Sequence, residues 1–199
     1  MAKTIDYYFT PISPWTYLGG ERLTEIAARH GAEVRVKPVD FGVIFPQTGG
    51  LPLAQRPKER QAYRLVELKR WAAHLGLPLN LHPKHFPAPD TLAASVILAA
   101  TETGGDPLRL ANAIGRAVWA EERNLADAGT LQDIAEATGH DGTALLAKAA
   151  DPSIRAKREA LNQEALAAGV FGAPTYVVDG ELFWGQDRLD FLDRKLAAG

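Results

Sequence analysis

Near both ends of the chain, hydrophobic and polar positions follow the patterns of strands. In the region between, apolar residues recur at helical spacing. Residues 4–9 are β-branched and aromatic, and residues 33–39 alternate between polar and apolar side chains, as strands do. Between them, apolar residues recur near helical spacing as far as Gly31, after Ser13 and Pro14, which suit a helix start. The pattern predicts a β-α-β unit with a parallel strand pair and a right-handed crossover.

The middle of the chain has a different pattern. Residues 42–57 are rich in glycine and proline and are predicted to form a long loop. Beyond them, alanine and leucine dominate at helical spacing and β-branched residues are sparse, so we expect a block of helices whose apolar stripes pack against one another. The expected helices are 58–75, 90–103, 107–122, 131–138, 142–150 and 152–168.

The strand pattern returns near the end of the chain. Residues 174–178 and 181–184 are expected to form two strands, joined by a tight turn at Asp179-Gly180. A last helix is expected over 187–196. The order of elements favours an α/β fold that is interrupted by a helical insertion.

Composition excludes several kinds of chemistry. The 199 residues contain no cysteine, which rules out disulfides, thiolate metal sites and a thiol nucleophile of the chain's own. With 22 basic and 24 acidic residues, the net charge is −2. The chain therefore lacks the excess positive charge that is typical of proteins that bind nucleic acid or an anionic membrane. We expect no metal centre either, because His82 and His85, the only closely spaced histidines, stand in a proline-containing loop.

No targeting or membrane-spanning pattern is visible. The first six residues have one cation and then an acid, without the apolar run of a signal peptide. No stretch approaches the roughly 18 uncharged apolar residues of a membrane helix. A cytoplasmic location is therefore the expectation.

Two motifs at the ends of the chain carry a resemblance to a known family. The first is Ser13-Pro14-Trp15-Thr16-Tyr17-Leu18, and the second is Gly169-Val170-Phe171-Gly172-Ala173-Pro174-Thr175 followed by Phe183-Trp184-Gly185-Gln186-Asp187-Arg188-Leu189. Together they resemble the 2-hydroxychromene-2-carboxylate isomerases, which belong to the group of DsbA-like proteins and kappa-class glutathione transferases. The resemblance covers nearly the whole chain.

The resemblance implies a fold, a cofactor and an assembly. The fold is thioredoxin-like, with residues 1–48 plus 152–199 forming the discontinuous thioredoxin-like domain and residues 49–151 an inserted all-helical domain. The cofactor is glutathione, the partner is a small electrophilic substrate, and the assembly is a homodimer.

Ser13 is the candidate catalytic residue. Thiol oxidoreductases of this fold carry Cys-x-x-Cys at the strand-to-helix turn, where this chain has Ser13-Pro14-Trp15-Thr16. A hydroxyl cannot cycle between thiol and disulfide, but it can donate a hydrogen bond to the thiolate of bound glutathione. The helix start would add to this stabilisation, because its free N–H groups and dipole favour an anion. The alternative is that Ser13 acts only as an N-cap.

The second motif implies further glutathione contacts. In thioredoxin-like folds the bond that matches Ala173-Pro174 is cis, so that the Ala173 backbone can pair with the cysteinyl backbone of glutathione. Asp187 can take the ammonium of the γ-glutamyl end, while Gln186 or backbone N–H groups take its carboxylate. The alternatives are a proline that simply begins a strand and an ordinary helix cap.

The chain departs from the family pattern at three positions. The isomerases often have aspartate where this chain has Thr10, and a family asparagine is replaced by Gly50. The lysine expected to meet the glycine carboxylate of glutathione is replaced by Arg60, with Lys58 and Arg56 close by, so the cation that does this is left open.

Three functions remain in competition. The first is a glutathione-dependent cis–trans isomerase acting on an aromatic-pyruvate substrate, with Trp15 and Phe86 lining the substrate side. The second is a kappa-like transferase or glutathione-linked oxidoreductase, and the third is a thioredoxin-fold binding protein without catalysis.

Overall fold

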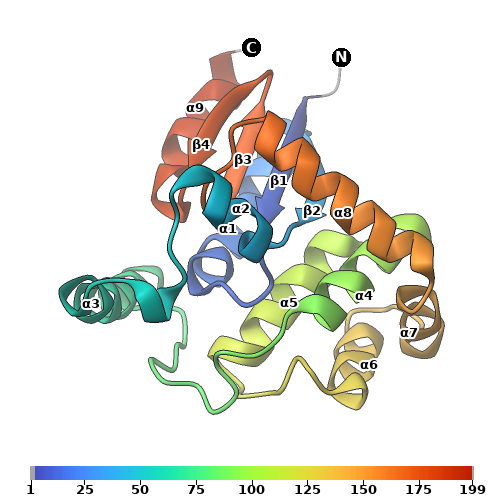
Figure 1. The fold of residues 1–199 in the computed structure, drawn as a ribbon. Helices are drawn as coiled ribbons and strands as arrows, with labels where there is room; N and C mark the ends of the chain where they lie inside the picture. The colour runs from blue at the N-terminus through green and yellow to red at the C-terminus, as the bar shows by residue number, and fades with distance from the viewer. Residues whose placement is uncertain (1–2, 199) are drawn as a thin grey trace.

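A computed structural model describes residues 3–198 as a four-stranded mixed sheet surrounded by helices (Figure 1). The strands are β1 (Thr4–Phe9), β2 (Glu33–Pro38), β3 (Thr175–Val178) and β4 (Glu181–Trp184), in the spatial order β2-β1-β3-β4. β1 pairs with β2 in parallel, and the other two pairs are antiparallel. The predicted β-α-β unit and the terminal hairpin are therefore confirmed.

The helices follow the predicted order, and their ends differ from the prediction by a few residues. They are α1 (Pro14–His30), α2 (Phe41–Thr48), α3 (Lys58–Leu75), α4 (Thr91–Glu102), α5 (Pro107–Trp119), α6 (Ala128–Ala137), α7 (Gly142–Ala149), α8 (Pro152–Ala167) and α9 (Leu189–Ala198), with short 3-10 turns η1 (Leu53–Gln55) and η2 (Gln186–Arg188).

The expectation of a continuous loop over residues 42–57 is wrong, because α2 occupies its first half. Asp40 caps this helix by accepting a hydrogen bond from the Gly42 N–H at 2.8 Å. Phe41 and Ile44, three residues apart, are buried against the sheet side of the molecule. Gly49 ends the helix with a φ of 77°, which a residue without a Cβ adopts at low cost.

The two faces of the sheet contact different helices. Ile5, Tyr7 and Phe9 point into the larger apolar cluster together with residues of α1, α5 and α9. Tyr8 points to the opposite face, into a smaller cluster with residues of α2 and α8. This alternation follows from the two-residue period of a strand, and because both faces are covered, four of the six residues of β1 are buried.

The helical region packs directly on the sheet layer. α5 contacts α1, and α4 contacts β2, so that one apolar cluster includes residues from both regions. α3 stands apart at one side of the molecule (Figure 1), with Leu68 and Ala72 as its only fully buried residues among those described. The division into two domains at residues 48 and 152 stays a prediction. Within residues 3–198, none of the helices combines the length and apolar character of a membrane span.

Candidate active site

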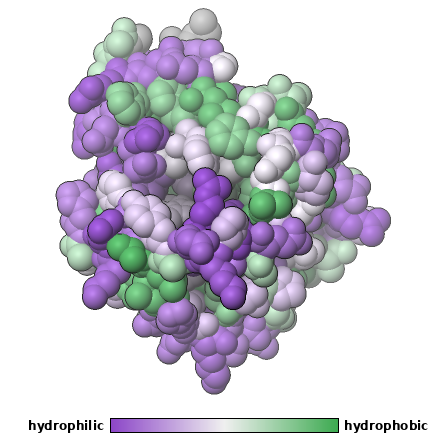
Figure 2. Space-filling model, turned by 60° about the vertical axis from the view of Figure 1, so that its left-hand side comes forward, coloured by the Kyte–Doolittle hydropathy of each residue, from purple (hydrophilic) through white to green (hydrophobic). Residues whose placement is uncertain are grey.

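A cavity of about 1100 Å³ opens where β1 leads into α1. Its walls come from the β1–α1 turn, α2, α3, the segment before α4 and the loop before β3. On the face of the molecule that includes α3, the surface is hollowed, and hydrophobic and hydrophilic residues both border the hollow (Figure 2). The cavity can therefore accept a ligand with both apolar and charged parts.

Ser13 lies in the cavity wall at the start of α1. Its Oγ accepts a hydrogen bond from the Thr16 N–H at 3.3 Å, which makes it the N-cap of the helix. This bond uses a lone pair of the oxygen and leaves the hydroxyl hydrogen free to donate. Capping the helix and donating to a ligand are therefore compatible roles for Ser13.

The start of α1 also presents a free backbone donor. Pro14 has no N–H, and the Thr16 N–H bonds to Ser13, whereas the Trp15 N–H makes no hydrogen bond within the described part of the chain. Free N–H groups at a helix start carry partial positive charge and favour an anion.

Ala173 lies on another wall of the cavity, and its peptide bond to Pro174 is cis, as the resemblance implied. Between residues 3 and 198, no hydrogen bond to the Ala173 backbone is present. Pro174 itself is buried, and its carbonyl accepts a hydrogen bond from the Gly185 N–H at 2.8 Å. The backbone beside the cavity is thus held in place while Ala173 keeps its hydrogen-bonding groups for a ligand.

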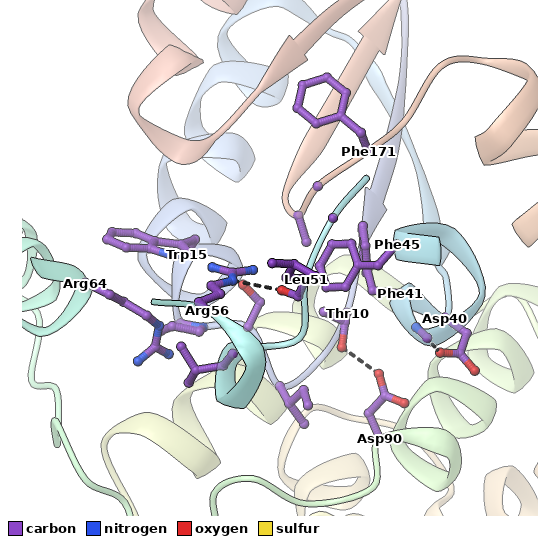
Figure 3. Close-up of a pocket in the computed structure, with 18 of the residues that line it drawn as sticks. Thr10, Trp15, Asp40, Phe41, Phe45, Leu51, Arg56, Arg64, Asp90 and Phe171 are labelled. Carbon is purple, nitrogen blue, oxygen red and sulfur yellow. Dashed lines mark hydrogen bonds between the residues drawn. The ribbon is translucent and has the colours of Figure 1, made fainter. Parts of the chain in front are cut away.

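Three arginines line the α3 side of the cavity: Arg56, Arg60 and Arg64. None of them forms an ion pair with the residues that the structure describes. Arg56 donates from Nε to the Leu51 carbonyl at 2.8 Å, which holds its guanidinium near the middle of the pocket (Figure 3). Lys58, the third candidate cation of the sequence prediction, is not among the lining residues.

Arg64 lies between the cavity and two aromatic rings. Its guanidinium carbon is 5.7 Å from the centre of the Phe86 ring and 5.8 Å from that of Trp119. Burial, together with the nearby charge of Arg56, lowers the pKa of Arg64 to about 10, so the group remains charged at neutral pH. Trp15 and Phe86 both line the cavity, where the sequence prediction placed them.

A buried polar network closes the opposite side of the cavity. Thr10 Oγ1 donates to Asp90 Oδ2 at 2.5 Å (Figure 3), and Arg158 Nη2 donates to Asp90 Oδ1 at 2.9 Å. The charges of an apolar-striped helix are usually solvated, but the Arg158 side chain on α8 is only 9% exposed and pairs with Asp90. A carboxylate thus stands beside Thr10, although position 10 itself is not acidic.

Gln186 and Asp187 lie outside the cavity lining. Gln186 is buried against α1, where Arg22 donates to its side-chain oxygen at 3.3 Å and to its carbonyl at 3.1 Å. Asp187 is exposed and pairs with Arg188 at 3.2 Å. The structure brings Ser13, Trp15, Arg60, Phe86 and Ala173 together around one cavity, but it does not bring these two residues there.

Several lining residues were missed by the sequence prediction. Arg64 follows Arg56 and Arg60 at intervals of four, the spacing of one helix face, which was an available signal. Asp90 was predicted only as the first residue of a helix; its side chain makes no capping bond and joins the Thr10 network instead. Phe171 and Trp184, whose ring centres are 4.8 Å apart, belong to motifs that were recognised without a role for their rings.

Comparisons with known proteins agree with this architecture. The family model described as DSBA-like thioredoxin domain matches residues 4–197. A 2-hydroxychromene-2-carboxylate isomerase of Sphingobium xenophagum is 32% identical over 199 residues, covering 98% of this chain and 99% of the relative. Human glutathione S-transferase kappa 1 is 23% identical over 205 residues, covering 96% of this chain and 89% of that protein.

A solved structure gives the same result at the level of the fold. The structure of a 2-hydroxychromene-2-carboxylate isomerase superposes with a TM-score of 0.78 at 25% identity, covering 98% of this chain and 95% of that one. The expected thioredoxin-like fold with an inserted helical region is confirmed. The chain belongs to the DsbA-like thioredoxin family, in which its relatives include 2-hydroxychromene-2-carboxylate isomerases.

Proposed function

We propose that this protein is a glutathione-dependent cis–trans isomerase acting on an aromatic-pyruvate substrate of the 2-hydroxychromene-2-carboxylate type. The observation that carries the proposal is Ser13, which lies in the cavity at the start of α1, in a chain that has no cysteine. A site arranged for a thiolate but without its own sulfur needs a thiol from outside. The relatives named as isomerases support the reaction, and the relative named as a glutathione transferase supports the thiol.

The residues present fit glutathione. The Ser13 hydroxyl and the Trp15 N–H are free to donate to a thiolate, and the Ala173 backbone is free to pair with a peptide. Arg60 and Arg56 offer unpaired guanidinium groups to the glycine carboxylate, and arginine can bind a carboxylate through two parallel hydrogen bonds. Asp187 lies outside the cavity lining, so in this proposal the γ-glutamyl end of glutathione extends beyond the lining to reach its carboxylate.

When bound, glutathione would supply a thiolate for reversible addition to the conjugated double bond of the substrate, whose carbonyl group would take up and return the electron pair. Ser13 stabilises the ionised sulfur, because a hydrogen bond to a charged group contributes about 1.5–3 kcal/mol. That corresponds to a drop of roughly one to two units in the thiol pKa, from about 8.5 for a cysteine-type thiol. The dipole of α1 acts in the same direction.

Trp15 and Phe86 form the apolar side of the cavity and offer surfaces for the aromatic ring of the substrate. The Phe86 ring is itself supported by Trp119, at a distance of 4.8 Å between ring centres. Holding the ring on a fixed surface orients the conjugated chain toward the α1 start, where the thiolate is stabilised.

Two measurements test the proposal. Calorimetric titration with glutathione is expected to show binding, and its absence would refute both enzymatic functions and favour a non-catalytic binding protein. Turnover of 2-hydroxychromene-2-carboxylate is expected to depend on added glutathione. Turnover that is confined to 1-chloro-2,4-dinitrobenzene would instead identify a kappa-like transferase.

The homodimer stays a prediction. Light scattering during gel filtration would measure the oligomeric state.

A further inference from the structure

Arg64 is a cation that the glutathione contacts leave unused. It lines the cavity from α3, one helical turn beyond Arg60, with its guanidinium over the Phe86 and Trp119 rings. Its charge is only partly hydrated there, and no carboxylate lies within ion-pair distance of it among residues 3–198. A half-buried guanidinium without a counter-charge favours an anionic ligand.

The carboxylates of the cavity wall do not satisfy this charge. Asp40 caps α2, Asp90 pairs with Arg158, and Glu67 pairs with Arg70 at 2.6 Å. Glu59 also lines the cavity, but it is exposed to solvent in the first turn of α3. The positive charge of Arg64 is therefore available to whatever fills the cavity.

The positions of the arginines assign them to two ligands. The glycine end of glutathione carries one carboxylate, for which Arg60 and Arg56 are at hand. Arg64 lies over the Phe86 ring, and Figure 3 draws its side chain on the same side of the view as Trp15, where the proposed function places the aromatic substrate. An aromatic pyruvate has a carboxylate of its own, which needs a separate partner.

We propose that Arg64 binds the carboxylate of the second substrate, so that the site selects anionic aromatic electrophiles over neutral ones. The inference rests on the proposed function for the identity of the first ligand, and it adds a residue that determines specificity. The aromatic ring of the substrate and the Phe86 ring share the apolar wall, while the guanidinium fixes the acid end.

The test compares two probes that have the same ring and conjugated ketone but differ in charge. Benzylidenepyruvate carries a carboxylate, and benzylideneacetone does not. Their binding to the protein without glutathione is followed by quenching of tryptophan fluorescence. The wild type is expected to bind benzylidenepyruvate at least about tenfold more tightly. Arg64→Gln is expected to lose this preference, and Arg64→Lys to keep part of it.

The matched control is Arg70→Gln, which removes an exposed arginine from the same helix. It is expected to leave the binding of both probes unchanged. Unchanged binding of benzylidenepyruvate to Arg64→Gln, or equal losses for both probes, would overturn the inference, since equal losses indicate a purely structural arginine. A wild type without preference for the acid would overturn it as well.

Failure of this inference can be told apart from failure of the proposed function. Glutathione titration of the same Arg64→Gln protein is expected to match the wild type within about twofold, because another cation meets the glycine carboxylate. Loss of the acid preference with normal glutathione binding supports the inference. A wild type that distinguishes the probes but binds no glutathione refutes only the proposed function.

Discussion

At the scale of single residues, Ser13 joins an observed structural role and a proposed chemical role in one hydroxyl group. Its lone pair caps α1, and its hydrogen is free to point at a ligand. A cysteine at the same place could use its own sulfur, whereas serine can only support a sulfur that arrives with a ligand. One atom in the side chain thus decides whether the site is a redox centre or a holder for an external thiol.

The Asp90–Arg158 pair is expected to contribute strongly to stability. Both side chains are nearly buried, at 16% and 9% exposure, and the two groups are 2.9 Å apart. Removing Asp90 leaves the charge of Arg158 unpaired in the interior, so Asp90→Ala should lower the free energy of unfolding by about 3 kcal/mol. Urea denaturation measures this change.

The matched control for this pair is Asp133→Ala. Asp133 forms an equally short pair with Arg123, at 2.8 Å, but its side chain is 69% exposed. The expected loss is below about 1 kcal/mol, because solvent screens such pairs. Similar losses for the two variants would contradict the role given to burial.

At the scale of elements, α3 supplies cations to the cavity from one face. Arg60 and Arg64 are one turn apart and line the cavity, whereas Lys58 in the same helix does not line it. Arg60→Gln should weaken glutathione binding about tenfold, because a charge-assisted hydrogen bond is lost. Lys58→Gln should change it by less than about twofold. Calorimetric titration with glutathione measures both variants. A larger loss of affinity for Lys58→Gln than for Arg60→Gln would contradict the assignment of Arg60 to the glycine carboxylate.

Ion pairs connect α8 to the sheet, and we expect their contribution to stability to depend on pH. Lys37 on β2 bonds to Glu164 on α8 and lies 2.7 Å from Asp6 on β1. Burial alone raises the pKa of Glu164, but hydrogen bonds from Lys37 and Tyr8 outweigh it, so the pKa is lowered below 4.5. A carboxyl with a lowered pKa stabilises the fold above its unfolded pKa and loses that contribution as the pH falls through the folded value.

Glu164→Gln should therefore destabilise the protein at pH 7 by on the order of 1 kcal/mol, because the side chain is about half exposed and partly screened. The difference from the wild type should shrink as the pH falls below 4.5. Urea curves at several pH values measure it. Glu159→Gln, in an exposed pair of the same helix, should show no such trend. A difference that is constant with pH would contradict the account.

α2 shows why one element escaped the sequence prediction. Pro46 lies inside this helix, and glycines follow it, so local composition favoured a loop. The features that favoured a helix were less conspicuous in the sequence: Asp40 as an N-cap, and two apolar residues at a spacing of three. In an eight-residue helix, burial of Phe41 and Ile44 supplies the stability that propensity does not.

At the scale of the whole molecule, the cavity lies where the sheet region and the helical region meet. The β1–α1 turn and Ala173 line one side of this cavity, which we propose for the thiol, and α3 with Phe86 lines the side that we propose for the substrate. The sequence motifs predicted the first side because its groups are tied to backbone features: a helix start and a cis proline. The second side was harder to predict, because side chains from separate segments converge there only after folding, as the placement of the Arg64 guanidinium over the Phe86 ring illustrates.

Glutathione is expected to stabilise the whole molecule, because it binds only the folded chain. At about 100 times its dissociation constant, the gain is about 2.7 kcal/mol. For a chain of this size that corresponds to a rise of roughly 5–10 °C in Tm. Calorimetric melting with and without glutathione measures the shift, and ophthalmic acid, which lacks the sulfur, serves as the control ligand. An unchanged Tm would argue against a glutathione site anywhere in the protein.

The most direct test of the central claim is the pKa of the glutathione thiol on the protein, measured from the ultraviolet absorbance of the thiolate. On the wild type the pKa should lie one to two units below about 8.5, and Ser13→Ala should return it most of the way. Asp141→Ala, which removes the cap of a helix remote from the cavity, should leave the thiol pKa unchanged. Equal thiol pKa values on the wild type and on Ser13→Ala would contradict the account.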